Sequence, residues 1–277
     1  MKIGIIGLGI IGGGYAKALK KYGYEVFGID KDKDTLEYAI KEKLIINCND
    51  DQTSIIPLLD VIFVCLYPKE TINFIKKNQN KFKKNSVVVD VSGVKRFISN
   101  SLIYEKEDYE IVLSHPIAGR ELIGLKNSNE AVFHDSNFVI CPHKYSTDEN
   151  MKLIEILAYQ IGFGHVSYLS DIEHDRILGY TSHLTHAIAI ALVNSDTKEA
   201  QTNLFIGDSY KDLTRIAKIN ENLWLELFEN NKDNLITHID KFVSELNKIK
   251  KSLKEKDRET LKELMLESRK RRCDIDG

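Results

Sequence analysis

Two histidine-bearing segments carry the side chains that proton transfer needs. The first, His115-Pro116-Ile117-Ala118-Gly119-Arg120-Glu121, follows the apolar run Tyr109–Leu113. The histidine is therefore expected where a buried strand ends, and the proline after it, which has no N–H to donate, is expected to stop the ladder. An imidazole titrates near neutral pH and can accept a proton. His115 is accordingly a candidate general base, although a His-Pro pair at a strand end also occurs in ordinary turns.

The second segment, His174–His186, is predicted to be helical. At 100° per residue, one face of this helix carries the carboxylate of Asp175, the hydroxyl of Ser182 and the imidazoles of His183 and His186. Gly179, which has no side chain, leaves a gap on the same face. His174 projects about 120° away and is expected to be poorly placed. Such a polar face is costly to bury without a purpose. A metal site and a buried polar network are alternatives, but a surface that faces a ligand is favoured.

Arg215 lies inside an otherwise apolar helical pattern at Lys211–Ala217. Arginine in such a setting usually pairs with a carboxylate. That carboxylate can belong to a ligand or to Asp212, three residues earlier.

A glycine fingerprint, Gly7-Leu8-Gly9-Ile10-Ile11-Gly12, lies between the first predicted strand and the first helix. Its glycines allow a tight turn, a close approach of a diphosphate and close helix–strand packing, and the helix N-terminus favours the negative charge. Asp30 ends the second strand, 18 residues beyond Gly12, and can accept hydrogen bonds from ribose hydroxyls. This arrangement predicts a dinucleotide site that prefers NAD to NADP, although Lys31 and Lys33 lie nearby.

Two later segments, Leu66-Tyr67-Pro68 and Ser92-Gly93, follow further predicted strands on the same carboxyl edge. The nicotinamide half of the cofactor is expected there.

Alternating strands and helices place these groups. The expected strands are Lys2–Ile6, Glu25–Asp30, Val61–Leu66, Val87–Val91, Ile111–Ser114, Phe138–Cys141 and His165–Leu169. The helices between them are Ile10–Tyr22, Thr35–Lys43, Lys69–Phe82, Val94–Tyr104 and Asp148–Ile161. The pattern predicts an α/β fold, a Rossmann-type, doubly wound, mostly parallel sheet, for an NAD-binding domain over residues 1–170.

Only helices are expected in residues 171–277, namely Asp171–Val193, Tyr210–Asn230, Lys232–Lys254 and Glu255–Arg272. They are long, apolar on one face and too few to close a core of their own. We therefore expect an all-helical substrate and dimerisation domain, with a homodimer formed through these helices.

Composition excludes several classes of protein. The chain has 277 residues, 43% of them hydrophobic and 29% charged, and a formal charge of −2, which offers no basis for binding nucleic acid. Its four cysteines form no C-x-x-C pair, which is typical of reduced thiols in a cytoplasmic protein without a zinc site. No apolar run is long enough for a membrane span, and Ile3–Ile6 is too short for a secretory signal.

The chain resembles the prephenate and arogenate dehydrogenase family of tyrosine biosynthesis over nearly its whole length. Besides the glycine fingerprint, three ordered motifs carry the resemblance: His115-Pro116-Ile117-Ala118-Gly119-x-Glu121, His174-Asp175…Ser182-His183-Leu184-x-His186 and Asp212-x-Thr214-Arg215-Ile216-Ala217. The stretch Trp224…Asn230-Asn231 also matches.

The resemblance implies oxidative decarboxylation of a cyclohexadienol, with hydride passing to NAD and the ring carboxylate leaving as CO₂. It implies that His115 accepts the ring hydroxyl proton and that Arg215 binds a substrate carboxylate. His183 and His186 would line the substrate pocket, which Glu121 would gate or polarise.

The chain departs from the family pattern at three positions. The family often has D-x-G-S-V-K, whereas Asp90–Lys95 here places its serine one residue earlier, at Ser92. Ser92 is therefore a candidate, not an assigned partner, for orienting the catalytic imidazole. Thr185 replaces a frequent proline, and Arg120 stands where the residue is often small or polar. Arg120 is a candidate for substrate selection.

Prephenate is the favoured substrate, and arogenate, which carries an amine in place of the side-chain ketone, is the nearest alternative. A β-hydroxyacid dehydrogenase shares the two-domain plan, but such enzymes usually employ a helix-borne lysine. A noncatalytic dinucleotide-binding regulator is the alternative from a different class.

Overall fold

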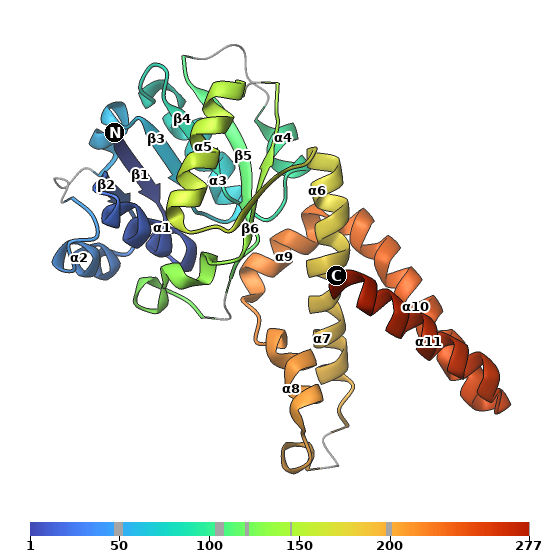
Figure 1. Cartoon of the computed structure of the whole chain (residues 1–277). Coiled ribbons are helices and arrows are strands. Elements are labelled where there is room, and N and C mark those ends of the chain that lie inside the picture. Colours follow the sequence, from blue (N-terminus) through green and yellow to red (C-terminus); the bar gives the residue numbers. More distant parts are fainter. Residues whose placement is uncertain (47–51, 103–107, 120–121, 145, 198–200, 277) are drawn as a thin grey trace.

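The computed structural model describes residues 1–46, 52–102, 108–119, 122–144, 146–197 and 201–276. Its N-terminal part is a sheet covered by helices, and its C-terminal part consists of helices alone (Figure 1). β7 ends at Tyr168 and the first helix of the second part, α6, begins at Asp171.

Seven strands form one sheet in the order β2-β1-β3-β4-β5-β6-β7. They are β1 (Lys2–Ile6), β2 (Glu25–Ile29), β3 (Val61–Val64), β4 (Val87–Asp90), β5 (Glu110–Pro116), β6 (Asn137–Cys141) and β7 (His165–Tyr168). All neighbours are parallel except β5 and β6, which run antiparallel. The central strands β3 and β4 are buried throughout, and apolar except for Asp90 at the end of β4, as expected of a parallel sheet covered on both faces.

Helices cover both faces of the sheet. α1 (Ile10–Lys21) and α5 (Asp148–Ile161) pack on one face, where Leu19, Leu157 and Phe63 share a buried core. α3 (Pro68–Asn78) and α4 (Arg96–Ser101) pack on the other. α2 (Lys33–Lys41) lies beside β2 at the edge of the sheet (Figure 1). Short 3₁₀ helices occupy Gln52–Leu58, Gln79–Lys81, Leu125–Asn127 and Glu130–Phe133.

The second part begins with α6 (Asp171–Leu178), which a Ser170–Glu173 capping box starts. A π-helical segment, Gly179–Leu184, continues it into α7 (Thr185–Asn194). The remaining helices are α8 (Asp208–Thr214), α9 (Glu221–Asn230), α10 (Lys232–Glu255) and α11 (Arg258–Asp276), with 3₁₀ turns at Thr202–Leu204 and Arg215–Ala217.

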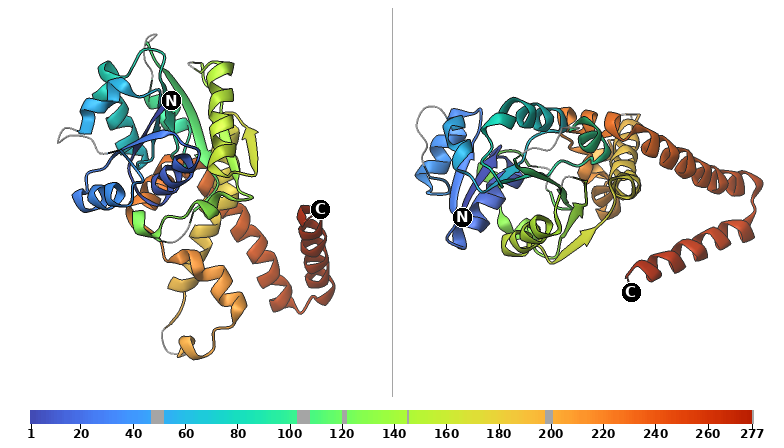
Figure 2. Two further views of the ribbon diagram at one scale, coloured as in Figure 1. Left: turned by 60° about the vertical axis from the view of Figure 1, so that its left-hand side comes forward. Right: turned by 90° about the horizontal axis from the view of Figure 1, so that it is seen from above.

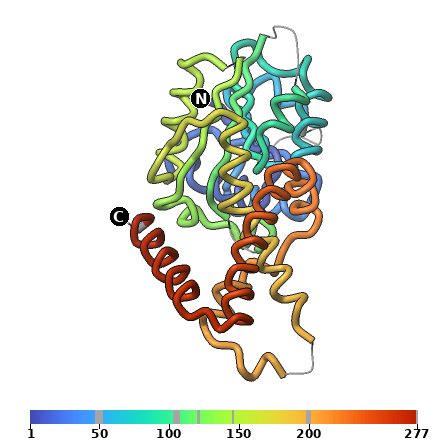
Figure 3. The backbone as a smooth tube through the Cα atoms, turned by 90° about the vertical axis from the view of Figure 1, so that its right-hand side faces the viewer, coloured from blue at the N-terminus to red at the C-terminus, as the bar shows by residue number. Residues whose placement is uncertain are grey.

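α10 and α11 form an arm that leaves the body of the molecule and turns back on itself near Lys256 (Figures 2 and 3). Apolar side chains of α10 are exposed along it, including Leu246 and Leu253, which are 53% and 61% exposed. No helix among the described residues is long and apolar enough to cross a membrane.

The expected fold class is confirmed, and the expected strands recur with small shifts of their ends. Three local predictions were wrong. Pro116 does not stop the ladder: it pairs with Phe138 inside β5, because β6 runs antiparallel and Ile117 donates the next bond, to the Asn137 carbonyl. The predicted helix Tyr210–Asn230 is broken between Ala217 and Glu221, and Asp171–Val193 contains the π-helical segment.

Candidate active site

A chain of hydrogen bonds joins β5 to α6 at the carboxyl edge of the sheet. Nδ1 of His115 lies 2.9 Å from Nε2 of His174, whose Nδ1 lies 2.8 Å from Oδ1 of Asp175. The Asp175 carboxylate also accepts the backbone N–H groups of Lys95 at 2.8 Å and Arg96 at 3.0 Å. His174 and Asp175 are buried, whereas His115 is half-buried. We call His115, His174 and Asp175 the relay.

The relay determines which nitrogen of each ring holds a proton. Burial alone would raise the pKa of Asp175, but the hydrogen bonds from His174 and the two amides hold it below its usual value. Since an ionised carboxylate only accepts, Nδ1 of His174 must donate, and Nε2 of the same ring is left to accept from Nδ1–H of His115. His115 therefore presents Nε2 with a free lone pair. Burial, reinforced by His174 and Lys95, holds the pKa of His115 well below its usual value, so the ring is neutral at pH 7.

Nε2 of His115 lies near Gly93, in the turn after β4. Gly93 in turn lies close to Leu227 of α9. A Cβ placed on Gly93 would lie 3.6 Å from Nε2 of His115 and 3.0 Å from a methyl group of Leu227. Nε2 of His115 thus lies at the junction between the sheet edge and the helical part.

A buried ion pair holds this edge in place. The Lys95 ammonium contacts the Asp90 carboxylate and the Ser114 carbonyl, and both charged side chains are 0% exposed. The Ser114 hydroxyl in turn donates to the Asp90 carbonyl at 2.8 Å. Because Lys95 also donates its backbone N–H to Asp175, one residue connects β4, β5 and the relay.

Ser92 belongs to the same turn but bonds within it. Its N–H donates to Asp90 Oδ1 at 2.9 Å, and its hydroxyl donates to the Val94 carbonyl at 3.3 Å. His174 occupies Nδ1 of His115, the position at which an orienting hydroxyl would bind. The group that contacts Nδ1 of His115 is therefore His174, whereas the Ser92 hydroxyl bonds the Val94 carbonyl.

The glycine fingerprint forms an open cradle at the start of α1. Gly7 has φ +88°, and a Cβ there would lie 2.6 Å from the Cys65 carbonyl oxygen; a Cβ on Gly12 would collide with the Gly7 carbonyl. A Cβ on Gly9 would meet nothing within 4 Å. The first and third glycines thus allow the chain to close tightly, whereas the second leaves space at a helix N-terminus, as a diphosphate requires. Leu8, Ile10 and Ile11 complete this turn and the start of α1.

Asp30 lies directly beyond β2, beside this cradle. Its carboxylate accepts the backbone N–H groups of Leu8 at 2.7 Å and Asp32 at 2.9 Å. The side chain is thereby held against the fingerprint, where an adenosine ribose is expected. The neighbouring Lys31 pairs with Glu70 at 3.3 Å on the surface.

The turn Leu66-Tyr67-Pro68 joins the sheet edge to the helical part. The Tyr67 hydroxyl accepts a bond from the Asn220 side chain at 2.7 Å, and the Lys69 N–H donates to Glu226 at 2.9 Å. The segment expected at the nicotinamide half of the cofactor therefore also contacts α9.

Side chains of the π-helical segment, α7 and α9, which we call the aromatic wall, lie near the relay. His186 stacks on Trp224 at 3.6 Å between ring centroids, and its Nδ1 bonds the Ser182 carbonyl at 2.9 Å. His183 meets the same indole edge-on at 5.9 Å and Phe228 at 6.1 Å. His183 and His186 thus share one aromatic neighbour, Trp224.

Several predicted site residues lie elsewhere than expected. His174, expected to be poorly placed, is the direct partner of His115. Gly179 offers no gap to a ligand, because a Cβ there would lie 3.1 Å from Asn234 of α10; its smallness lets two helices pack. Arg215 is exposed in the 3₁₀ turn that packs against α7. Arg120 and Glu121 lie outside the described residues.

Two residues at the site, Lys95 and Asn231, are not predicted to take part in it by the sequence, although both lie in motifs. The dipeptide His174-Asp175 was the available signal for the relay, because a carboxylate adjacent to a histidine can fix its tautomer. Among the described residues, no group of three His, Cys, Asp or Glu side chains could hold a metal ion.

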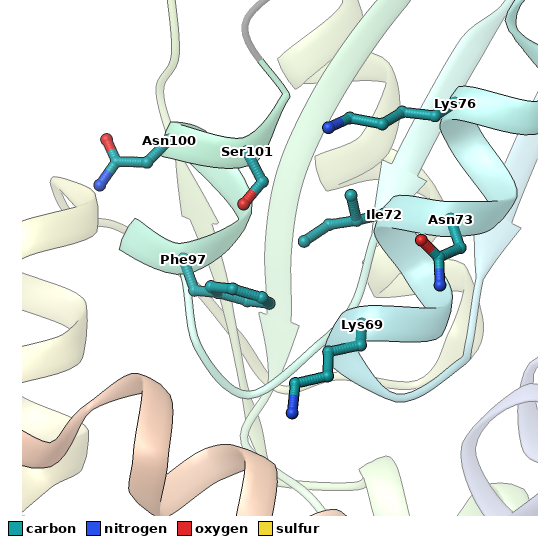
Figure 4. Close-up of a pocket in the computed structure, with 7 residues that line it drawn as sticks. All are labelled: Lys69, Ile72, Asn73, Lys76, Phe97, Asn100 and Ser101. Carbon is teal, nitrogen blue, oxygen red and sulfur yellow. The ribbon is translucent and has the colours of Figure 1, made fainter.

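An open hollow between α3 and α4 lies apart from the relay (Figure 4). It is lined by Lys69, Ile72, Asn73, Lys76, Phe97, Asn100 and Ser101. None of these residues belongs to the relay, the fingerprint or the aromatic wall.

Comparison with known proteins identifies the family of the chain. The model of the prephenate dehydrogenase nucleotide-binding domain matches residues 15–166, and that of the prephenate dehydrogenase dimerization domain matches residues 170–267. A cyclohexadienyl dehydrogenase of Zymomonas mobilis is 29% identical over 98% of this chain and 94% of its own. A prephenate dehydrogenase of Bacillus subtilis is 24% identical over 93% of this chain and 71% of its own.

Among solved structures, the prephenate dehydrogenase of Aquifex aeolicus in complex with hydroxyphenyl propionate and NAD⁺ superimposes with a TM-score of 0.88. It is 27% identical and covers 99% of this chain and 98% of its own. The fold class and the resemblance read from the sequence are thereby confirmed. With one domain model matching residues 15–166 and the other residues 170–267, the chain belongs to the prephenate dehydrogenase family.

Proposed function

We propose that the protein is an NAD-dependent prephenate dehydrogenase, which converts prephenate to 4-hydroxyphenylpyruvate and CO₂ in tyrosine biosynthesis. The observation that carries this proposal is the free Nε2 lone pair of His115, which the relay fixes beside the cofactor edge. Family membership and the NAD⁺ complex of the Aquifex aeolicus relative support it.

The cofactor is proposed to bind across the fingerprint, with Gly9 open to the diphosphate and Asp30 facing the ribose. The Asp30 carboxylate would repel a 2′-phosphate, which favours NAD over NADP. Bound NAD⁺ supplies a hydride acceptor for the hydrogen on ring carbon 4. Leu66-Tyr67-Pro68 and Gly93 line the edge where the nicotinamide half is expected.

The protein residues transfer one proton and bind the charged groups of the substrate. Nε2 of His115 accepts the proton of the ring hydroxyl as the hydride leaves ring carbon 4, so that oxygen becomes a carbonyl. Cleavage of the bond to the ring carboxylate releases CO₂ and leaves its electron pair in the ring, which becomes aromatic with a phenolate oxygen. Protonated His115 can return its proton to that oxygen. A positioned base of this kind contributes roughly 10²–10⁴-fold in rate.

The substrate is proposed to lie between the sheet edge and the aromatic wall. His183 and His186 line this space, and Arg215 binds a substrate carboxylate through a charge-assisted bond. Glu121 is proposed to gate or polarise the pocket, as the resemblance implies, and Arg120 is proposed to take part in substrate selection; both lie outside the described residues.

Arogenate is the second candidate substrate, since it differs only in the side-chain amine. The deciding experiment measures kcat/KM of the purified protein for prephenate and arogenate, each with NAD⁺ and NADP⁺. We expect prephenate with NAD⁺ to exceed the other combinations at least tenfold. A preference for arogenate would reassign the substrate, and no turnover in any combination would leave a dinucleotide-binding regulator as the function.

We further propose a cytoplasmic homodimer formed through the C-terminal helices. The matched dimerization domain supports the dimer, as do the exposed apolar side chains along α10.

A further inference from the structure

The side-chain amide of Asn231 is buried at the junction of α9 and α10 and touches three groups. Its Nδ2 lies 2.7 Å from the backbone oxygen of Asp175 and 3.2 Å from Nδ1 of His183. Its Oδ1 accepts a bond from Asn234 at 2.8 Å. Both hydrogens of one amide nitrogen are thus directed at the site.

The contacts of Asn231 fix its orientation without ambiguity. A backbone carbonyl can only accept, so the amide atom that faces the Asp175 oxygen must be the nitrogen. One hydrogen of this nitrogen goes to that carbonyl, and the other meets Nδ1 of His183. Because an accepting ring nitrogen carries no proton, the proton of neutral His183 must be on Nε2.

The Nε2–H group of His183 is left available. The side chain is buried between Trp224 and Phe228, and Nε2 makes no hydrogen bond with any residue in the part of the chain that the structure describes. Burial lowers the pKa of His183 to about 4, so the ring is neutral at pH 7. The side chain is therefore an uncharged, directional donor.

We propose that Asn231 is a positioning residue that holds His183 as a hydrogen-bond donor to an oxygen of the bound substrate. His115 and His183 then present opposite polarity: one Nε2 accepts the hydroxyl proton and the other Nε2 donates. A neutral donor binds an anionic substrate without placing a second cation beside the base. This inference rests on the proposed function.

The decisive variant is Asn231→Asp, which has nearly the same shape but no hydrogens to donate. The new carboxylate can only accept, so Nδ1 of His183 must carry the proton and Nε2 of the neutral ring becomes an acceptor. At pH 8 we expect KM for prephenate to rise at least tenfold, with kcat lowered less than threefold. The affinity for 4-hydroxyphenylpyruvate, followed through fluorescence of the single tryptophan, Trp224, should fall by the same factor.

The pH dependence of this variant separates positioning from simple disruption. The carboxylate at position 231 raises the pKa of His183, and the protonated ring donates from both nitrogens. The KM of the variant should therefore return toward the wild-type value as the pH falls below about 6.5. The other titratable groups around His183 are Asp175 and His174 on α6, His186 on α7 and His115 on β5, and the wild type shares them all.

Asn230→Asp is the matched control, because it makes the same chemical change one residue earlier. The Asn230 side chain bonds the Glu226 carbonyl within α9 and does not touch His183. We expect its KM to stay within twofold of the wild type at every pH.

The tautomer of His183 can also be read directly in the wild-type protein. A ¹H–¹⁵N correlation spectrum of histidine-labelled enzyme, assigned with His183→Gln, should show an unprotonated Nδ1 and a protonated Nε2. A protonated Nδ1 would overturn the proposal even if Asn231→Asp failed to fold. An unchanged KM, or a loss that does not vary with pH, would also overturn it. Failure of the wild type to turn over prephenate or arogenate would instead refute the proposed function, and the spectrum would still report on the tautomer.

Discussion

At the scale of single residues, one carboxylate sets the protonation of the site. Asp175 holds its charge through His174 and two backbone amides, and that charge fixes the proton positions in His174 and His115. Its own backbone oxygen orients Asn231, which faces His183. Asp175 therefore orients both the proton acceptor, His115, and the proposed donor, His183.

Replacing His115 by Asn should lower kcat at least tenfold, because the amide cannot accept the ring hydroxyl proton. The expected loss is within the roughly 10²–10⁴-fold range of a positioned base. Steady-state kinetics measure it, and titration with NAD⁺ is the control, since His115 makes no contact with the fingerprint. Full activity in this variant would remove His115 as the base.

Replacing Asp175 by Asn should lower kcat about tenfold or more, because an amide no longer favours one tautomer of His174 or stabilises a protonated His115. Asp171→Asn provides the matched control one helical turn earlier, where the carboxylate bonds the Ser99 hydroxyl at 2.6 Å. It should retain kcat within twofold. Equal losses in both variants would show that α6 was merely loosened.

Protonation of His115 is expected to determine how kcat/KM falls at acid pH. Its pKa lies well below 6.5, chiefly through burial and then through His174 and Lys95, so the base is unprotonated at neutral pH. The value of kcat/KM should therefore stay level from pH 8 to pH 6.5 and fall only in more acid solution, as the ring takes up a proton. A decline that begins above pH 7 would contradict this reading of the site.

The sequence alone led to His115, Asp30 and the glycines, because each stands at a strand end or in a spaced motif that local geometry explains. It did not lead to the partnership of His115 with His174. That contact spans 59 residues and depends on where α6 lies against the sheet. Periodicity within one helix contains no information about its neighbour.

At the scale of elements, the π-helical segment alters the helix face projected from the sequence beyond Gly179. A π turn closes its hydrogen bonds from i to i+5, so each residue turns the helix by less than in an α-helix. Residues after Gly179 are therefore displaced from the positions that 100° per residue assigns. His183, within this segment, lies buried against Asn231. Gly179, at its start, packs against α10.

Two alanine substitutions distinguish the roles of the glycines. Gly9→Ala should keep the wild-type Tm but weaken NAD⁺ binding at least tenfold, because its Cβ has free space that the diphosphate needs. Gly12→Ala should lower the Tm, since its Cβ collides with the Gly7 carbonyl. Thermal melting with and without NAD⁺ measures both. Wild-type binding by Gly9→Ala would place the diphosphate elsewhere.

The strands were predicted well because buried parallel strands are continuous apolar runs bounded by turns. The break between α8 and α9 was not, because Lys218–Asn220 contains neither glycine nor proline. There the Asn220 side chain caps α9 by accepting the Leu223 N–H and also donates to Tyr67, so a contact with the other domain accompanies the break.

At the scale of the whole molecule, the arm of α10 and α11 leads to a test of assembly. In the described part of the chain, apolar side chains along this arm, including Leu246 and Leu253, are exposed. We expect light scattering to give twice the chain mass, and Leu246→Glu with Leu253→Glu to give the monomer. A wild-type monomer at micromolar concentration would contradict the proposed dimer.

The cluster of neutral histidines should make the fold sensitive to acid. The pKa values of His115, His174 and His183 are lower in the folded chain than the usual 6.5, with burial the main cause and His183 at about 4. Below pH 6.5 the unfolded chain therefore binds more protons, and stability falls as the pH is lowered. His183 alone should cost roughly 2 kcal/mol by pH 5. The Tm drop from pH 7 to pH 5 should shrink in His183→Gln.

The relay crosses the boundary between the two domains, and this has a consequence for recombination. His115 is encoded in the first domain, whereas His174, Asp175 and Asn231 are encoded in the second. A chimaera could join this sheet to the helices of a relative that lacks the His-Asp pair. It would contain His115 but not the two residues that fix its tautomer. We expect such a hybrid to fold and to bind NAD⁺. Without the His-Asp pair, however, nothing would hold the proton of His115 on Nδ1 and keep Nε2 unprotonated.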